Sequence, residues 1–391
     1  MPRGAGRGPT STWLRRQLVE QLEGNGCLSS PAIRRAFLAV PRERFLWEVA
    51  EREGLERVYQ DQAIVTLRDP RGIPASSSSQ PSIMAAMLEQ LDLGRGHRVL
   101  EVGAGTGYNA ALLARIVGAG GDVVSVELDA ATARGARRAL ARVKSAASVV
   151  VGDGRDGWPR GAPYDRIIVT ASSPTVPRAW YDQLSDGGLV ELPLLLNRTG
   201  QAQAIIILRK QMGALHSQAL LHGGFMRLRD APGAAVPSPP PSLAVTERID
   251  ERSRPLAHLS GVALRKLSRA HRQQLLALAL CEPRRHPLGL RAPRLELTLY
   301  LTIEAPENRY IGGWPRIGVV SADGSGLAML AGGPKTFTHI EAYGDPDSER
   351  LLGELIEKWR KRGRPTSKDL QVEVGFAPTG SSNIRLSWAS R

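Results

Sequence analysis

The chain has 391 residues, of which 42% are hydrophobic and 23% charged, a composition typical of a folded globular protein with room for two domains. Its formal net charge of +14 comes mainly from arginines that are spread along the chain without interleaved aromatic residues. This pattern argues against a nucleic-acid partner and favours an acidic peptide. No apolar run reaches the roughly 18 residues of a membrane-spanning helix, which excludes a membrane protein.

The two cysteines, Cys27 and Cys281, lie far apart and match no metal-binding or redox spacing. We therefore expect no metal site and a reducing compartment, the cytoplasm. The N-terminal stretch is basic but amphipathic, with no continuous apolar core, so we do not expect a secretory signal.

Residues 11–70 are predicted to be helical. TWLRRQLVEQL (12–22) has apolar residues at helical spacing, and PAIRRAFLAVPRERFLWEVA (31–50) predicts a second helix that Pro41 breaks. The stretch GIPASSSSQPS (72–82) follows, directly before the helical run IMAAMLEQL. Its four serines are compatible with a flexible joint or with a hydroxyl-rich loop that binds a ligand.

From residue 97 onward, short β-branched runs alternate with Ala- and Leu-rich helical segments, which predicts a doubly wound α/β sheet. The predicted strands are RVLEV, DVVSVEL, SVVVGD, RIIVTA, LVELPLLL, AQAIIIL and a last one within 215–229. No helical segment separates the last two, so we expect them to form an antiparallel hairpin at one edge.

The segment APGAAVPSPPPSLA (231–244) reads as an extended linker between two domains. Residues 1–230 are expected to form the first domain, with helices in 11–70 and the sheet in 75–230. Residues 245–391 predict an accessory α+β domain with strands LELTLYLTI, RIGVVSADGSGLAML (around a turn at Asp323-Gly324) and LQVEVGF, and with the amphipathic helix SERLLGELIEKWRKR. We expect this domain to help hold a peptide.

VLEVGAGTGYNAALLARIVG (99–118) reads as a strand, a glycine turn and a helix. Glu127 ends the next strand, where a carboxylate can accept hydrogen bonds from both ribose hydroxyls of a nucleoside. Asp153 follows the third strand and could hydrogen-bond the adenine amine. No phosphate-binding lysine follows the glycines, and their spacing is one residue short of the dinucleotide fingerprint, so S-adenosylmethionine fits better than NAD. The predicted donor-binding residues are Glu101, Gly103, Ala104, Gly105, Thr106, Gly107, Tyr108, Asn109, Glu127, Leu128, Asp153 and Gly154. Alternatively, Glu127 is a solvated residue at the strand end, and Asp153 has only a structural role in the turn that contains it.

VPRERF (40–45), YQDQAI (59–64), SQPSIMAAMLEQL, the glycine motif, GDGRDGW, IIVTASSPTVPRAW and QLSDGGLVELPL occur in the order found in protein L-isoaspartate O-methyltransferases. The resemblance covers roughly residues 15–229. It implies a seven-stranded class I methyltransferase sheet, S-adenosylmethionine as donor, and methylation of a peptide carboxylate. It also places Ser79 at the active-site serine, so Ser77, Ser78 and Ser79 are the predicted catalytic residues.

Two departures from the family pattern favour a narrower branch. The family's histidine is Ser82 here, within a loop of serines, and an extra domain follows. Both resemble enzymes that act on ribosomally made modified peptides in lanthipeptide and graspetide pathways, where an aspartate of a macrocyclised precursor is methylated and the ester proceeds to succinimide or isoaspartate. The predicted partner is such a precursor peptide, bound by a monomer. Repair of L-isoaspartyl residues in damaged proteins is the alternative, and an inactive peptide-binding scaffold is a third, against which the intact glycine motif argues.

Overall fold

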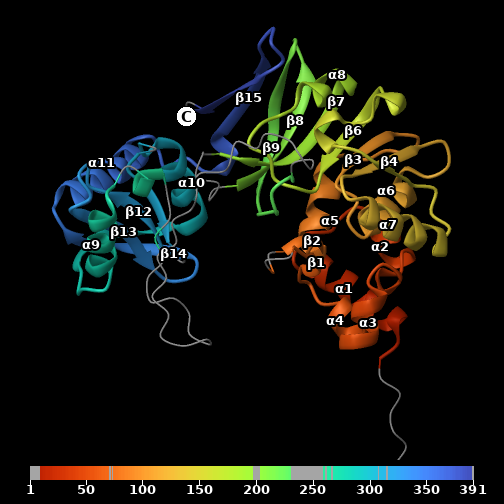
Figure 1. Cartoon of the computed structure of the whole chain (residues 1–391), viewed down its shortest axis with the longest axis horizontal. Coiled ribbons are helices and arrows are strands. Elements are labelled where there is room, and N and C mark those ends of the chain that lie inside the picture. The colour runs from red at the N-terminus through yellow and green to blue at the C-terminus, as the bar shows by residue number, and fades with distance from the viewer. Residues whose placement is uncertain are drawn as a thin grey trace, which may run out of the picture.

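The computed structural model describes residues 9–69, 72, 74–196, 203–229, 259, 262–265, 267–306, 308–313 and 316–389. Figure 1 shows two bodies, a larger one with the N-terminal helices and a nine-stranded sheet, and a smaller one with a five-stranded sheet. The predicted linker, 231–244, lies outside the described residues, and the domain boundaries placed around it remain predictions.

The N-terminal region is helical up to residue 58, as predicted, in the helices α1 (Ser11–Gly24), α2 (Pro31–Ala39), η1 (Arg42–Arg44), α3 (Trp47–Glu53) and α4 (Leu55–Val58). The break at Pro41 is confirmed, because α2 ends two residues before it. The prediction was wrong beyond residue 63, where β1 (Ile64–Arg68) pairs antiparallel with β2 (Pro74–Ser78). Three of the four serines therefore lie in a strand, which a run of identical polar residues does not reveal by periodicity.

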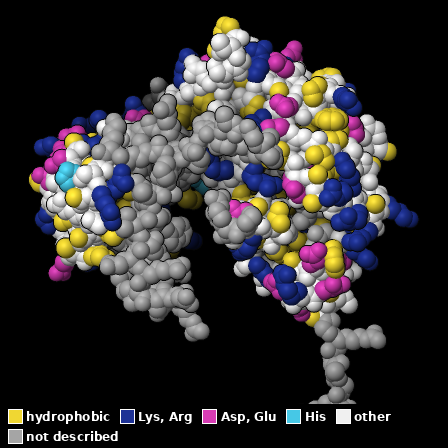
Figure 2. All heavy atoms as spheres, in the orientation of Figure 1, with side chains coloured by type: hydrophobic (Ala, Val, Ile, Leu, Met, Phe, Trp, Pro, Cys, Tyr) yellow, Lys and Arg dark blue, Asp and Glu magenta, His cyan; other side chains and the backbone are white. Residues whose placement is uncertain are grey.

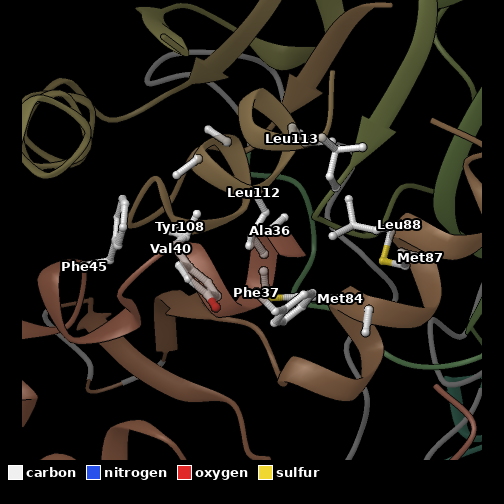
Figure 3. Packing of buried hydrophobic residues seen from close by; sticks show 14 of the residues in the cluster. Ala36, Phe37, Val40, Phe45, Met84, Met87, Leu88, Tyr108, Leu112 and Leu113 are labelled. Atoms are coloured by element: carbon white, nitrogen blue, oxygen red, sulfur yellow. The ribbon is translucent and has the colours of Figure 1, made fainter. Parts of the chain in front are cut away.

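The N-terminal helices pack against α5 (Pro81–Gln90) and α6 (Tyr108–Val117) around one apolar cluster. Figure 3 shows Phe37, Phe45 and Met84 near the start of α6. The rings of Phe37 and Phe45 meet the ring of Tyr108 edge-on, with centroids 6.3 and 5.5 Å away. The helices thus brace the point at which the glycine motif turns into α6.

The large sheet has the strand order β16-β15-β9-β8-β7-β6-β3-β4-β5. Its seven predicted strands are β3 (Arg98–Val102), β4 (Asp122–Glu127), β5 (Ser148–Val151), β6 (Tyr164–Val169), β7 (Leu184–Leu195), β8 (Gln203–Gln211) and β9 (Ala214–His222). The five parallel strands, β3 to β7 in chain order, are linked by α6, α7 (Ala130–Arg142), η2 (Gly154–Asp156), η3 (Pro159–Gly161) and α8 (Arg178–Gln183). The doubly wound α/β prediction is confirmed.

The antiparallel pairing of β8 with β9 is also confirmed, but the hairpin is not at the edge. Strand β15 (Leu370–Phe376) pairs with β9, and β16 (Ser382–Trp388) pairs with β15. The Ser217 hydroxyl accepts a hydrogen bond of 2.8 Å from the Val372 amide. In Figure 1 the blue C-terminal hairpin lies beside the green strands. The seven-stranded prediction is therefore corrected to nine, because an exposed strand edge offers unpaired backbone groups that another segment can satisfy.

The smaller sheet has the order β10-β14-β13-β12-β11 and is entirely antiparallel. Its strands are β10 (Arg284–Pro293), β11 (Tyr310–Gly313), β12 (Arg316–Val320), β13 (Gly326–Gly332) and β14 (Thr336–Gly344), accompanied by η4 (Val262–Arg265), α9 (Arg269–Ala279), α10 (Arg294–Glu304), α11 (Asp347–Lys361) and η5 (Ser367–Asp369). The predicted turn at Asp323-Gly324 and the helix α11 are confirmed. The Asp323 carboxylate accepts a hydrogen bond of 2.9 Å from the Ser325 amide in that turn.

The predicted strand LELTLYLTI is in fact α10, and this prediction was wrong. Leu297, Tyr300 and Leu301 pack into the core of the small sheet, whereas Leu299 and Ile303 pack into the core of the large sheet. A helix that is buried on two sides carries apolar residues at almost every second position, and this imitates the alternation of a strand.

The surface carries many Lys and Arg side chains, and Figure 2 shows them interspersed with Asp and Glu on both bodies. This agrees with the spread of arginine along the sequence. Within the described ranges, no helix has both the length and the apolar character needed to cross a membrane.

Strand β7 contains a buried acid, Glu191, which is fully inaccessible to solvent. Its strand neighbours are Ile168 of β6 and Ile207 of β8, and neither carboxylate oxygen has a hydrogen-bond partner among the described residues. Burial raises the pKa of Glu191 well above 4.5. The native chain therefore holds a proton on Glu191 that the unfolded chain releases above about pH 4.5. The free energy of unfolding consequently falls as the pH rises from that value through the raised pKa.

Glu191→Leu should raise the free energy of unfolding at pH 8 by about 1–4 kcal/mol, because an apolar side chain of similar size removes the cost of burying the acid. The gain should be smaller at pH 5, and urea denaturation at both pH values measures it. Glu373→Gln, at a position of β15 whose side chain is 44% exposed, should change stability by less than about 0.5 kcal/mol. A Leu variant less stable than the wild type at pH 8 would contradict this account.

Candidate active site

A cavity of about 390 Å³ opens at the carboxyl ends of β3, β4 and β6, where ligands of open α/β sheets bind. It brings together most of the residues predicted from sequence. The members that line it are Ser77, Ser78, Ser79, Glu101, Gly103, Ala104, Gly105, Thr106, Tyr108, Asn109, Glu127, Leu128 and Gly154. Gly107 and Asp153 are not among the lining residues.

The glycine turn depends on backbone that other residues rarely adopt. Gly103 has φ 98°, and a Cβ there would lie 2.5 Å from the Thr170 hydroxyl oxygen. Gly107, with φ 85°, is the N-cap of α6 and packs against Ala136 of α7, which explains why it does not reach the cavity. The glycines therefore serve the turn and its packing as well as access to the cavity.

Glu127 ends β4 and is 7% exposed. Its carboxylate accepts hydrogen bonds from the Gly105 amide at 3.0 Å and the Asp129 amide at 3.1 Å. The Arg229 guanidinium lies 3.7 Å from Glu127 Oε1, the oxygen that accepts from the Asp129 amide. Glu127 is thus held against the glycine turn rather than free in solvent, and its edge still lines the cavity.

Glu101 is fully buried at the end of β3. Its carboxylate accepts hydrogen bonds from Asn109 Nδ2 at 2.8 Å and from the Ser125 hydroxyl. Burial is the largest influence and raises the pKa of Glu101 to about 7, although both hydrogen bonds act in the opposite direction. The site therefore holds an acid that is poised to ionise when a cation approaches.

Asp153 caps the short helix η2 instead of facing the cavity. Its carboxylate accepts a hydrogen bond of 3.0 Å from the Arg155 amide and pairs with the Arg155 guanidinium at 2.6 Å. The hydrogen bond from Arg155 lowers the pKa of Asp153. Its predicted contact with an adenine amine remains a prediction, whereas the neighbouring Gly154 lines the cavity.

The serines form one wall of the cavity. Ser76 and Ser78 of β2 are buried, Ser77 and Ser79 are half-buried, and all four line the cavity. A Cβ on Gly105 would lie 3.4 Å from the Ser77 carbonyl oxygen, so the strand passes directly over the glycine turn. The serine stretch therefore forms a wall of the cavity beside the glycine turn, and three of its residues belong to a paired strand.

Arg42 and Asp61 hold this wall, and sequence reasoning missed both. Arg42 is fully buried; its guanidinium donates to the Ser79 carbonyl at 3.2 Å and lies 5.5 Å from the ring centroid of Tyr108. Asp61 accepts a hydrogen bond of 2.8 Å from the Ser82 amide at the start of α5. The sequence did mark both positions, because Arg42 lies in VPRERF and Asp61 lies in YQDQAI, two of the segments on which the family resemblance rests.

Residues 224–229 form a further wall of the cavity, and they were predicted as part of the last strand. Strand β9 ends at His222, and the chain then turns beside β6. The Ser172 amide donates to the Met226 carbonyl at 2.8 Å, and the Leu228 amide donates to the Ser172 carbonyl at 2.8 Å. This segment was missed as cavity lining because nothing in its sequence shows that it folds back.

The cavity combines a carboxylate side, suited to a cationic nucleoside ligand, with a hydroxyl side that can orient an anion by neutral hydrogen bonds. A carboxylate acceptor is already ionised at neutral pH and needs no general base. The arrangement therefore fits the transfer of a group from a cationic donor to a carboxylate oxygen.

Residues 14–231 match the family described as Protein-L-isoaspartate(D-aspartate) O-methyltransferase (PCMT). A protein-L-isoaspartate O-methyltransferase of Thermotoga maritima is 42% identical over 182 residues, which are 46% of this chain and 56% of that protein. One from Thermococcus sibiricus is 42% identical over 185 residues, which are 46% of this chain and 77% of that protein. The match therefore spans little more than half of the Thermotoga protein.

A solved structure of a protein-L-isoaspartate O-methyltransferase is similar to the whole molecule, with a TM-score of 0.54 and 27% identity over 95% of this chain and 99% of that chain. The likeness thus extends well beyond residue 231. The prediction of an S-adenosylmethionine-dependent carboxyl O-methyltransferase is confirmed at the level of the family. The chain belongs to the protein-L-isoaspartate (D-aspartate) O-methyltransferase family.

Proposed function

We propose that this protein methylates the free carboxylate of L-isoaspartyl residues in polypeptides. The observation that carries this is the position of the serine strand over the glycine turn, where a Cβ on Gly105 would lie 3.4 Å from the Ser77 carbonyl oxygen. An acceptor held by the serines would then lie beside a donor held by the turn. Such positioning can contribute roughly 7–11 kcal/mol to a two-reactant step.

The donor, S-adenosylmethionine, supplies a methyl group on a cationic sulfur. Glu127, held at the end of β4, would accept hydrogen bonds from the ribose hydroxyls of the donor. Glu101 offers buried negative charge to a cationic part of the ligand, and its pKa of about 7 is one that such a ligand would lower. Both acids line the same cavity as the glycines.

The acceptor side needs orientation more than activation. A guanidinium paired directly with the acceptor carboxylate would stabilise its ground state, because the carboxylate loses charge as the new bond forms. The Ser77 and Ser79 hydroxyls avoid this cost. Arg42 acts from behind the wall, where it binds the Ser79 carbonyl and so positions the strand.

The narrower prediction, an aspartate of a cyclised ribosomal peptide, is a second candidate. The extra C-terminal region no longer favours it, because the structural likeness to a protein-L-isoaspartate O-methyltransferase covers 95% of this chain. What still favours it is the run of serines from 76 to 79 and Ser82 in place of the family's histidine.

A direct comparison of acceptors tests the proposal. We expect methyl transfer from labelled S-adenosylmethionine to a linear peptide containing L-isoaspartate, and none to the same peptide with ordinary aspartate. A macrocyclic peptide with ordinary aspartate serves as the third substrate. Transfer to that macrocycle but not to the isoaspartyl peptide would overturn the proposal in favour of the second candidate.

Ser79→Ala should lower turnover of the isoaspartyl peptide by about 10- to 100-fold, equivalent to about 1.4–2.8 kcal/mol of activation free energy. The reason is the loss of a hydroxyl that orients the acceptor. Donor affinity, measured by calorimetry, should stay unchanged. Ser381→Ala is the matched control, because Ser381 is exposed and does not line the cavity. Equal turnover in the wild type and the Ser79 variant would remove Ser79 from the reaction.

Donor binding should depend on the ionisation of Glu101. Because its pKa lies at about 7, lowering the pH from 8 to 6 protonates it and should weaken S-adenosylmethionine binding about 5- to 10-fold. Calorimetry without acceptor measures this. Glu101→Gln should bind the donor more weakly at pH 8 and lose most of the pH dependence. Wild-type affinity that is identical at pH 6 and 8 would show that the donor does not sense this acid.

A further inference from the structure

A second cavity, also of about 390 Å³, adjoins the first. It lies between one face of α7 and the opposite side formed by η1, α3 and β1, and we call it the arginine-rimmed groove. Four residues line both cavities: Val65, Ser76, Gly105 and Thr106. The groove is therefore continuous with the proposed acceptor wall.

One side of the groove is apolar, and small residues line the side that faces it. Trp47, Val65 and Leu67 line it and are 45%, 37% and 41% exposed, unusually high for large apolar side chains that lie together. The facing helix, α7, contributes small residues that leave the groove open: Ala131, Gly135, Ala136 and Ala139. An extended polypeptide segment is a ligand that could cover the apolar side chains.

The rim is basic. Arg44, Arg52, Arg138 and Arg142 line the groove, against the acids Glu48 and Asp129. Arg52 pairs with Glu53 at 2.7 Å, and Asp129 is engaged in capping α7, where it accepts from the Thr132 amide at 2.7 Å. Within the part of the chain that the structure describes, Arg44, Arg138 and Arg142 form no ion pair, which leaves guanidinium groups available for carboxylates.

We propose that the arginine-rimmed groove binds the stretch of substrate polypeptide next to the methylated residue and selects stretches with acidic side chains. This rests on the proposed function. A polypeptide whose carboxylate reaches Ser77 and Ser79 must continue over neighbouring surface, and the groove begins at Ser76. Uncompensated arginines around an apolar wall match an extended segment that carries Glu or Asp beside apolar residues.

The test uses two fluorescein-labelled isoaspartyl peptides that differ only in flanking residues, Glu in one and Gln in the other. Fluorescence anisotropy with the full chain and S-adenosylhomocysteine should show the Glu peptide binding about 5- to 30-fold more tightly at low salt, a preference that shrinks in 0.5 M NaCl through screening. The double variant Arg138→Gln, Arg142→Gln should reduce the preference to about 2-fold or less.

The matched control is Arg115→Gln, Arg134→Gln, which removes two exposed arginines that do not line the groove. It should keep the wild-type preference. Equal binding of both peptides by the wild type, or an unchanged preference in the groove variant, would overturn the inference.

Methyl transfer to both peptides is measured separately. If neither peptide is methylated while the affinity preference follows the groove arginines, the proposed function fails and the groove stands. If both are methylated without any affinity preference, the groove inference fails and the proposed function stands.

Discussion

The close approach of β2 to the glycine turn is the constraint on which the site depends. Glycine is needed at Gly103 because a Cβ there would lie 2.5 Å from the Thr170 hydroxyl oxygen, and it is favoured at Gly105 because the backbone has φ 51°. Arg42 secures the approach from behind, since one guanidinium contacts both the Ser79 carbonyl and the ring of Tyr108. The start of α6 and the end of the serine stretch are therefore joined through one buried side chain.

Charge is distributed unequally around this contact. In the proposed arrangement, Glu101 and Glu127 lie on the donor side of the cavity, and Ser77 and Ser79 lie on the acceptor side. Burying Glu101 is unfavourable, as its raised pKa indicates, and a cationic ligand would offset that cost. The arginines contribute differently: Arg42 is buried behind the serine wall, and the groove arginines lie beyond it, so neither group pairs directly with the reacting carboxylate in the proposed arrangement.

The C-terminal region is structurally continuous with the methyltransferase sheet. The hairpin of β15 and β16 covers the edge of β9, and α10 carries apolar residues into the cores of both sheets. The Trp388 indole of β16 also donates to Glu304 at the end of α10 at 2.9 Å. The two sheets thus share apolar and polar contacts. The likeness to a solved protein-L-isoaspartate O-methyltransferase over 95% of the chain is consistent with an arrangement used by other members of the family.

Local pattern was sufficient to predict the parallel strands, the glycine turn and a set of site residues, most of which line the cavity. These depend on short-range periodicity and on residues, such as Gly103 and Glu127, whose chemistry is tied to their place at a strand end. Tertiary structure alone decided that three of the serines form a strand, that α10 is a helix, and that residues 370–388 complete the first sheet. The physical reason is that each of these depends on a partner distant in sequence, such as Ile64 for Ser78 or His216 for Glu373. Periodicity within one segment carries no information about which distant segment pairs with its backbone or covers its apolar face.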